Sequence, residues 1–189
     1  RWIAVAAMVG LVGGGTAGWL APAGAQTGVE DAVWRAAGIV PFPRPLQAPP
    51  LHLTDLSGKP VDVQHFRGRL VMLYFWATWG PHCTRELPSI DALHAEFDKD
   101  GLTVLLVAVA EPRETVAQAT TARGYTARVL LDRDGRASDA YRVQGTPTVY
   151  LIGRDGLLLG RAVGPRPWTQ APGRALLAAL LGPASGPSR

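Results

Sequence analysis

The sequence predicts an α/β domain with a mixed central sheet flanked by helices, and two features of the chain lead to this fold class. Two largely apolar segments of strand length, the continuous run Leu70–Trp76 and the segment Leu102–Ala110, are each followed by a segment with the pattern of a helix. Strands joined by a helix run parallel, whereas hairpin-like patterns before and after them would add antiparallel strands. At 189 residues, 47% of them apolar, the chain can bury one such core and is short for two domains.

The remaining elements follow in order along the chain. Leu51–Leu53 and Val61–Val63 alternate around a polar turn, which predicts an N-terminal hairpin. Pro81 suits the first position of a helix, because its missing N–H is not needed there. Apolar spacing and flanking Gly or Pro predict strands at 70–76, 102–110 and 129–131, helices at 81–97 and 111–123, a turn at 132–135, a hairpin of 148–152 with 157–163, and a closing helix at 169–181.

The N-terminal stretch predicts export. No charged residue occurs from Trp2 to Val29, and the small-x-small triplet at 23–25 is typical of a cleavage site, so residues 1–25 are expected to be a signal peptide. An uncleaved membrane anchor is the competing interpretation, because about twenty uncharged residues suffice to span a bilayer. Both interpretations place the protein in the periplasm or another extracytoplasmic compartment, and the second attaches it to a membrane.

Residues 26–50 predict a linker ahead of the ordered domain. Five prolines fall between positions 41 and 50, which is typical of an extended spacer, and Glu30–Ala37 has the pattern of a short helix. The folded domain is expected at residues 46–182, followed by a flexible tail at 183–189.

Composition excludes several kinds of chemistry. The net charge of +4 comes from scattered basic residues without a run, so no nucleic-acid partner is expected. Cys83 is the single cysteine, which excludes an internal disulfide and a cysteine-rich metal cluster. The four histidines lack ligand-like spacing, and no phosphate-binding glycine motif follows a core strand, so neither a metal site nor a cofactor is predicted.

The junction between the first buried strand and its helix carries the strongest motif. Residues 75–88 read FWATWGPHCTRELP. This segment resembles the pattern W-A-x-W-C-x-x-C-x-x-E-x-P of the TlpA/ResA branch of the thioredoxin superfamily, a family of thiol–disulfide oxidoreductases. Further matches at 53–59, 66–69, 131–135, 141–148 and 151–156 extend the resemblance over about residues 46–181. It implies a thioredoxin-like fold with an N-terminal hairpin extension.

Gly80 is where the sequence departs from the family pattern. It stands at the position of the first cysteine, the exposed nucleophile of the family, while Cys83 matches the second, which resolves the mixed disulfide. A neighbouring thiol acts at an effective concentration of roughly 10⁵–10⁸ M, so its loss excludes fast dithiol cycling within one chain. Cys83 retains two interpretations. It is either a reactive thiol, favoured by the N–H groups of the first helical turn, or a small buried apolar residue.

Two neighbours of Cys83 are candidate catalytic residues. The resemblance implies that Glu86 handles protons around the thiol, and its i+3 spacing places it on the same helix side as Cys83. The alternative is a carboxylate that only stabilises the helix N-terminus. His82 occupies the position of a histidine that stabilises the nucleophilic thiolate in Cys-Pro-His-Cys members of the superfamily. Because that nucleophile is missing here, the alternative is an exposed remnant.

A second set of residues is expected to bind a partner. The resemblance implies that Pro147 is the family's cis-proline, and that Thr146 before it presents backbone groups to an extended peptide or thiol partner. Trp79, Gly80 and Pro81 are expected to line the same surface. The alternative is a rigid turn needed only for folding.

Three functions remain open from the sequence. The first is an exported TlpA-like protein limited to monothiol exchange through Cys83 with an external thiol. The second is a redox-inactive binding or chaperone-like protein that uses the cis-proline groove. The third is a one-cysteine peroxidase, because the segment 80–86 is similar to a peroxiredoxin motif, although Gly80 replaces its threonine. The expected partners are exported cysteine-containing proteins or an external thiol reductant, so whether the chain is an enzyme stays open.

Overall fold

The computed structural model describes residues 27–182, and one eight-stranded sheet organises them in the order β1-β8-β7-β4-β5-β6-β2-β3. The expected signal or anchor segment and the expected tail lie outside these residues. The elements are α1 (Asp31–Ala37), β1 (Val40–Pro41), β2 (Leu53–Asp55), β3 (Pro60–Val61), the 3-10 helix η1 (Val63–Phe66), β4 (Leu70–Trp76), α2 (Pro81–Phe97), the 3-10 helix η2 (Asp98–Asp100), β5 (Leu102–Val109), α3 (Arg113–Thr121), β6 (Arg128–Asp132), α4 (Arg136–Ala140), β7 (Thr148–Ile152), β8 (Leu158–Val163) and α5 (Ala171–Leu181).

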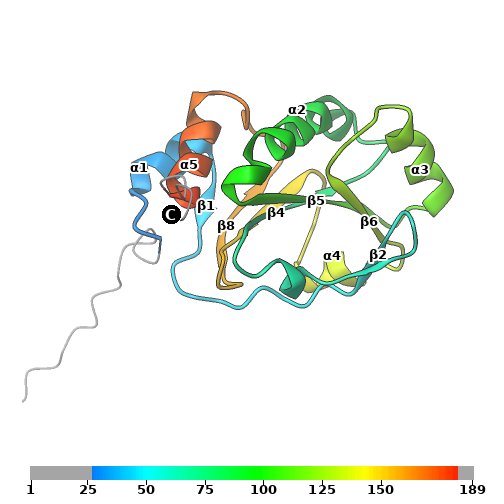
Figure 1. Ribbon diagram of the computed structural model, residues 1–189, viewed down its shortest axis with the longest axis horizontal. Coiled ribbons are helices and arrows are strands. Elements are labelled where there is room, and N and C mark those ends of the chain that lie inside the picture. Colours follow the sequence, from blue (N-terminus) through cyan, green and yellow to red (C-terminus); the bar gives the residue numbers. More distant parts are fainter. Residues whose placement is uncertain (1–26, 183–189) are drawn as a thin grey trace, which may run out of the picture.

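The centre of the sheet confirms the expected mixed α/β architecture. Strands β4, β5 and β6 are parallel, and β7 pairs with β4 in the antiparallel direction. All seven residues of β4 are buried, as expected for a strand covered on both faces. Alternate side chains of β4 point to opposite faces and divide the core into two clusters. Figure 1 shows α2 and α3 on one side of the sheet and α4 on the other.

The N-terminal hairpin is continuous with the main sheet. Strand β2 pairs with β3 on one side and with β6 on the other, both antiparallel. Strand β2 begins two residues later than the pattern predicts and β3 begins one residue earlier, and the 3-10 helix η1 takes the place of the second strand's end. The hairpin is therefore an edge of the domain rather than a separate appendage.

Residues 27–50 differ from the extended linker that the prolines predict. Helix α1 packs on the domain through Trp34, which is 1% exposed, and β1 pairs with β8. Gly160 on β8 makes room for the indole, since a Cβ there would lie 2.6 Å from a Trp34 ring atom. Pro41 is tolerated because β1 is an edge strand and needs few ladder donors.

Helix α4 is absent from the sequence-based prediction, which places only a turn before it. The helix begins after Gly135 because the buried carboxylate of Asp132 accepts the N–H groups of Ala137, at 3.0 Å, and Ser138, at 2.8 Å. This capping interaction satisfies donors that a five-residue helix cannot pair internally.

Replacing Trp34 with alanine tests whether the N-terminal segment belongs to the domain. We expect a loss of about 3–5 kcal/mol in the free energy of unfolding, because the buried indole would leave a cavity between α1 and β8. Denaturant unfolding measures this loss. Trp79→Ala is the matched control, since Trp79 is 76% exposed, and its effect should stay within about 0.5 kcal/mol. Equal effects of the two substitutions would contradict the packing of α1 as a structural element.

Candidate functional site

The candidate site lies where β4 ends and α2 begins. The turn between them is closed by the Gly80 N–H, which donates to the Ala77 carbonyl at 3.2 Å. Helix α2 starts at Pro81 and ends at Phe97, as the sequence predicts. Trp79 projects from this turn with 76% of its surface exposed, in contrast to the fully buried Trp76 three residues before it.

Glu111 holds the turn in place, although it is not among the site residues predicted from the sequence. It follows β5, and its carboxylate accepts the Thr78 N–H at 2.8 Å and also the Thr78 hydroxyl. Ala110 before it has φ of 54°, a left-handed conformation that costs a non-glycine residue free energy. The position of Glu111 directly after β5 could have indicated this role. The carboxyl ends of the adjacent parallel strands β4 and β5 meet at one edge of the sheet, so residues that follow the two strands lie close together.

Cys83 is fully buried beneath the turn. Its exposed fraction is 0%, and it packs in the core cluster that α2 shares with the sheet. A Cβ placed on Gly80 would lie 3.1 Å from the Cys83 Sγ and 3.5 Å from its Cβ. Disulfides have Cβ atoms about 3.5–4.5 Å apart. The backbone thus keeps a geometry that a cysteine pair at 80 and 83 requires, although one of the two sulfur atoms is missing.

Glu86 is a buried carboxylate in the same helical turn as Cys83. Its oxygens accept the Tyr74 hydroxyl at 2.8 Å and the Arg166 N–H at 2.7 Å. Burial raises the pKa of the Glu86 carboxyl above its ordinary value, and these hydrogen bonds, with the charges of Arg166 and His82, offset only part of that increase. Burial and the neighbouring Glu86 likewise raise the pKa of Tyr74, whose hydroxyl also interacts with the Cys83 thiol.

His82 is exposed on the first turn of α2. Its Nδ1 lies 3.4 Å from the Nη2 of Arg85, whose Nε donates to the Pro81 carbonyl at 3.1 Å. The side-chain hydrogen bonds of His82 within residues 27–182 do not include the Cys83 thiol. The structure therefore brings Glu86 and Cys83 together through Tyr74, and it brings His82 to Arg85 instead.

The proline loop lies opposite the Trp79 turn. The Thr146–Pro147 bond is cis, as the resemblance implies. Thr148 pairs with Phe75 of β4, so the loop before β7 and the turn after β4 share one edge of the sheet. The Pro147 carbonyl accepts the Gly164 N–H at 2.8 Å, whereas the N–H and C=O of Thr146 have no hydrogen-bond partner among residues 27–182.

Val163 adds an apolar side chain that the sequence analysis did not identify. It pairs with Thr148 across the sheet and is 50% exposed. We name the residues at this edge the cis-proline surface, and they are Trp79, Gly80, Pro81, Thr146, Pro147 and Val163. Trp79, Pro81 and Val163 are exposed and Thr146 is half-buried, whereas Gly80 and Pro147 are buried behind them.

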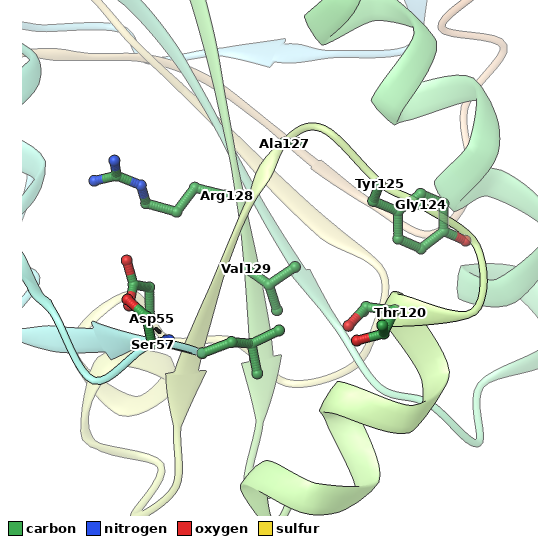
Figure 2. Close-up of a pocket in the computed structure, with 10 residues that line it drawn as sticks. Asp55, Ser57, Thr120, Gly124, Tyr125, Ala127, Arg128 and Val129 are labelled. Atoms are coloured by element: carbon green, nitrogen blue, oxygen red, sulfur yellow. Dashed lines mark hydrogen bonds between the residues drawn. The ribbon is translucent and has the colours of Figure 1, made fainter.

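Two clefts lie away from this surface. One of about 410 Å³ separates Asp55 and Ser57 from Thr120 and Tyr125 (Figure 2). The Asp55 carboxylate there is occupied by the hairpin turn, where it accepts the Ser57 hydroxyl at 2.6 Å and two backbone N–H groups. The other cleft, of about 600 Å³, borders the His52–Asp62 ion pair. Residues 27–182 contain no group of three or more candidate metal ligands.

The fold and the β4–α2 turn together define a thioredoxin-like protein. Comparison with known proteins extends this assignment, because the AhpC/TSA family model matches residues 46–160, and the chain belongs to that family. A thiol:disulfide interchange protein of the thioredoxin family from Chlorobium tepidum TLS is similar in structure, with a TM-score of 0.65 and 28% identity over 74% of this chain and 98% of that one.

Proteins of known family that resemble this chain in sequence are thiol-disulfide oxidoreductases. The chain is 37% identical to the thiol-disulfide oxidoreductase ResA of Geobacillus kaustophilus, over 58% of this chain and 63% of that protein. It is 33% identical to the thiol-disulfide oxidoreductase ResA of Bacillus subtilis strain 168, over 58% of this chain and 61% of that protein. The matched region thus spans less than two thirds of these relatives. The resemblance to thiol–disulfide oxidoreductases is confirmed at the level of the family.

Gly80→Cys is expected to restore a disulfide with Cys83, because the Cβ positions already suit the bond. Intact mass after mild oxidation should show the loss of two hydrogens, and thiol titration in denaturant without reductant should find no free thiol. Gly80→Ser is the matched control, since it fills the same position without a second sulfur. Two free thiols in oxidised Gly80→Cys would show that the turn has lost this geometry.

Glu86→Gln is expected to change how stability depends on pH. A carboxyl whose pKa is raised in the folded state binds more protons there than in the unfolded chain. Its contribution to the free energy of unfolding is therefore complete at low pH. That contribution is lost as pH rises from the ordinary pKa of 4.5 to the raised pKa of the folded state. The variant should lack this loss, so its free energy of unfolding relative to wild type should increase over that range. Glu96→Gln, at an exposed ion pair with Arg174, is the control. A difference independent of pH would contradict the raised pKa.

Proposed function

We propose that this chain is an extracytoplasmic thioredoxin-fold protein that binds an extended segment of a partner on the cis-proline surface and does not cycle a disulfide by itself. One observation carries the proposal. The single thiol, Cys83, has no exposed surface, whereas Trp79 is exposed and the peptide groups of the half-buried Thr146 have no hydrogen-bond partner among residues 27–182.

The burial of Cys83 argues against unaided redox turnover. A thiolate must reach the sulfur it attacks, and access controls reactivity as strongly as thiolate content does. In the two-cysteine family pattern the residue at position 80 makes that attack, and the residue at 83 acts afterwards from inside. With Gly80 in the first position, the inner thiol has no mixed disulfide to resolve.

The cis-proline surface supports binding on its own. An extended segment can hydrogen-bond to the free N–H and C=O of Thr146, in the way that strands are added to a sheet. Trp79 and Val163 supply apolar contacts on either side, and an exposed tryptophan is typical of residues that dominate binding energy. By analogy with the named thiol–disulfide oxidoreductases, the partners are exported proteins that contain cysteine.

Export is part of the proposal and rests on the uncharged stretch from Trp2 to Val29. Within residues 27–182, no helix is both long enough and apolar enough to cross a membrane. Whether the stretch is cleaved or serves as an anchor decides whether the surface works in solution or beside a membrane.

Monothiol exchange is the second candidate function, favoured by the absence of a side chain on Gly80. The Cys83 thiolate would attack a partner disulfide, form a mixed disulfide and release the partner's other sulfur as a thiolate. An external thiolate would then attack the mixed disulfide and free Cys83. This route requires local opening that exposes the Cys83 Sγ.

Thiol labelling and binding separate the two candidates. We expect Cys83 in the folded protein to react with a thiol reagent on the order of 100-fold more slowly than in denaturant, because reaction awaits local opening. Binding of partners captured under reducing conditions should survive Cys83→Ser and be lost with Trp79→Ala.

The opposite outcome has a distinct signature. Fast labelling of the folded protein, together with partners that are held only through a reducible bond to Cys83, would favour monothiol exchange. A sulfenic acid at Cys83 after peroxide treatment, detected by mass, would instead favour the peroxidase alternative.

A further inference from the structure

The segments that form the cis-proline surface carry charge of one sign. Three stretches contribute to it, at 77–85, 142–148 and 161–167, and none of them contains Asp or Glu. Apart from the buried Cys83 thiol, their titratable residues are all basic, and we call this set the basic rim: His82, Arg85, Arg142, Arg161 and Arg166. The chain as a whole has 15 acidic residues against 19 Lys and Arg, so a region without acids is a local feature of this edge.

Arg85 is the arginine of the basic rim nearest to the Trp79 turn in sequence, and its side chain is anchored there. Its Nε donates to the Pro81 carbonyl at 3.1 Å, which holds the guanidinium over the first turn of α2. No carboxylate within residues 27–182 forms an ion pair with it. Other arginines do have such partners, in the pairs Arg69–Asp98, Arg136–Asp134 and Arg174–Glu96.

Arg161 supplies charge on the Val163 side. Both residues are exposed, and the residue between them, Ala162, is buried, so the two side chains lie on the same face of β8. A basic and an apolar side chain therefore stand together on this strand. The segment that leads into α2 likewise contains an exposed apolar residue, Trp79, and an exposed basic residue, Arg85.

Two carboxylates lie beneath the surface, and both are already engaged. Glu111 is 8% exposed and accepts two hydrogen bonds from Thr78. Glu86 is also 8% exposed and accepts hydrogen bonds from Tyr74 and the Arg166 backbone. Neither forms an ion pair with Arg85, Arg142 or Arg161, so these exposed guanidiniums remain available to a ligand.

We propose that the segment bound on the cis-proline surface is acidic: an extended peptide whose apolar residue packs on Trp79 and Val163 while flanking Asp or Glu side chains meet Arg85 and Arg161. This assignment rests on the proposed docking function and names the chemistry of its partner. Charge complementarity of this kind selects partners and suppresses wrong ones, because a basic segment would face like charges at both ends of the site.

Three cysteine-free peptides test the proposal on the full-length protein. They share the centre Ala-Leu-Val and differ only in the flanking residues, which are Asp, Asn or Lys; a dye at one end reports binding by fluorescence anisotropy. The Asp peptide should bind roughly five- to tenfold more tightly than the Asn peptide, and the Lys peptide more weakly than either, as expected for two exposed charge pairs. The preference should shrink as salt is raised.

Charge reversal identifies the residues responsible. Arg85→Glu should weaken the Asp peptide roughly fivefold or more and strengthen the Lys peptide. Arg123→Glu is the matched control, because it makes the same change of charge beside Tyr125, at the distant cleft, and should leave all three affinities within about twofold.

The possible outcomes distinguish the preference for acidic peptides from the proposed binding function on which it rests. If the three peptides bind equally and Trp79→Ala abolishes binding, docking stands and the acidic preference is wrong. If none binds, both are wrong. If the protein instead binds vesicles of phosphatidylglycerol and phosphatidylcholine through Arg85 while the peptides bind without regard to charge, the basic rim faces a membrane and the peptide assignment is overturned.

Discussion

The pairing of β4 with β7 is the constraint on which the candidate site depends. Phe75 lies opposite Thr148, so the turn that follows one strand and the loop that precedes the other meet at a single edge of the sheet. Each half alone is an ordinary connection between elements. A shift of one residue in this register would reverse the facing of every side chain along β7 and separate Trp79 from Pro147. The buried runs on both strands hold the register, because a shift would expose apolar surface.

Buried carboxylates hold the loops at this edge and beside it. Glu111 fixes the Trp79 turn, Glu86 ties α2 to the loop after β8, and Asp132 begins α4, each by accepting backbone N–H groups. A hydrogen bond to a charged group contributes about 1.5–3 kcal/mol, whereas a buried donor left without a partner costs about 1–3 kcal/mol. These hydrogen bonds therefore fix the conformation of loops that carry little regular structure. The raised pKa of Glu86 shows that burial of its charge outweighs the hydrogen bonds it gains.

The sequence predicts the centre of the fold better than its margins. The bounds of Leu70–Trp76, Pro81–Phe97 and Thr148–Ile152 agree with the structure, because a long apolar run or a proline at a helix start is a local signal. The docking of Trp34 and the anchoring role of Glu111 could not be predicted, since both depend on residues distant in the chain. The same holds for the candidate site. The motif predicts which residues form it, whereas the burial of Cys83 depends on packing against distant residues and could not be predicted.

That burial gives a physical reason why a lone cysteine can persist in such a site. A neighbouring thiol would release a mixed disulfide at an effective concentration of roughly 10⁵–10⁸ M, and without one the release depends on dilute external thiols. In the oxidising compartment that we propose for this chain, an exposed lone thiol would be captured and stay captured, with its partner blocking the cis-proline surface. Cys83 avoids this outcome because its sulfur lies in the core beneath Gly80. A two-cysteine site binds its partner and exchanges a disulfide with it at the same place. Here the single sulfur atom is buried, so a partner can bind the cis-proline surface without reacting with Cys83.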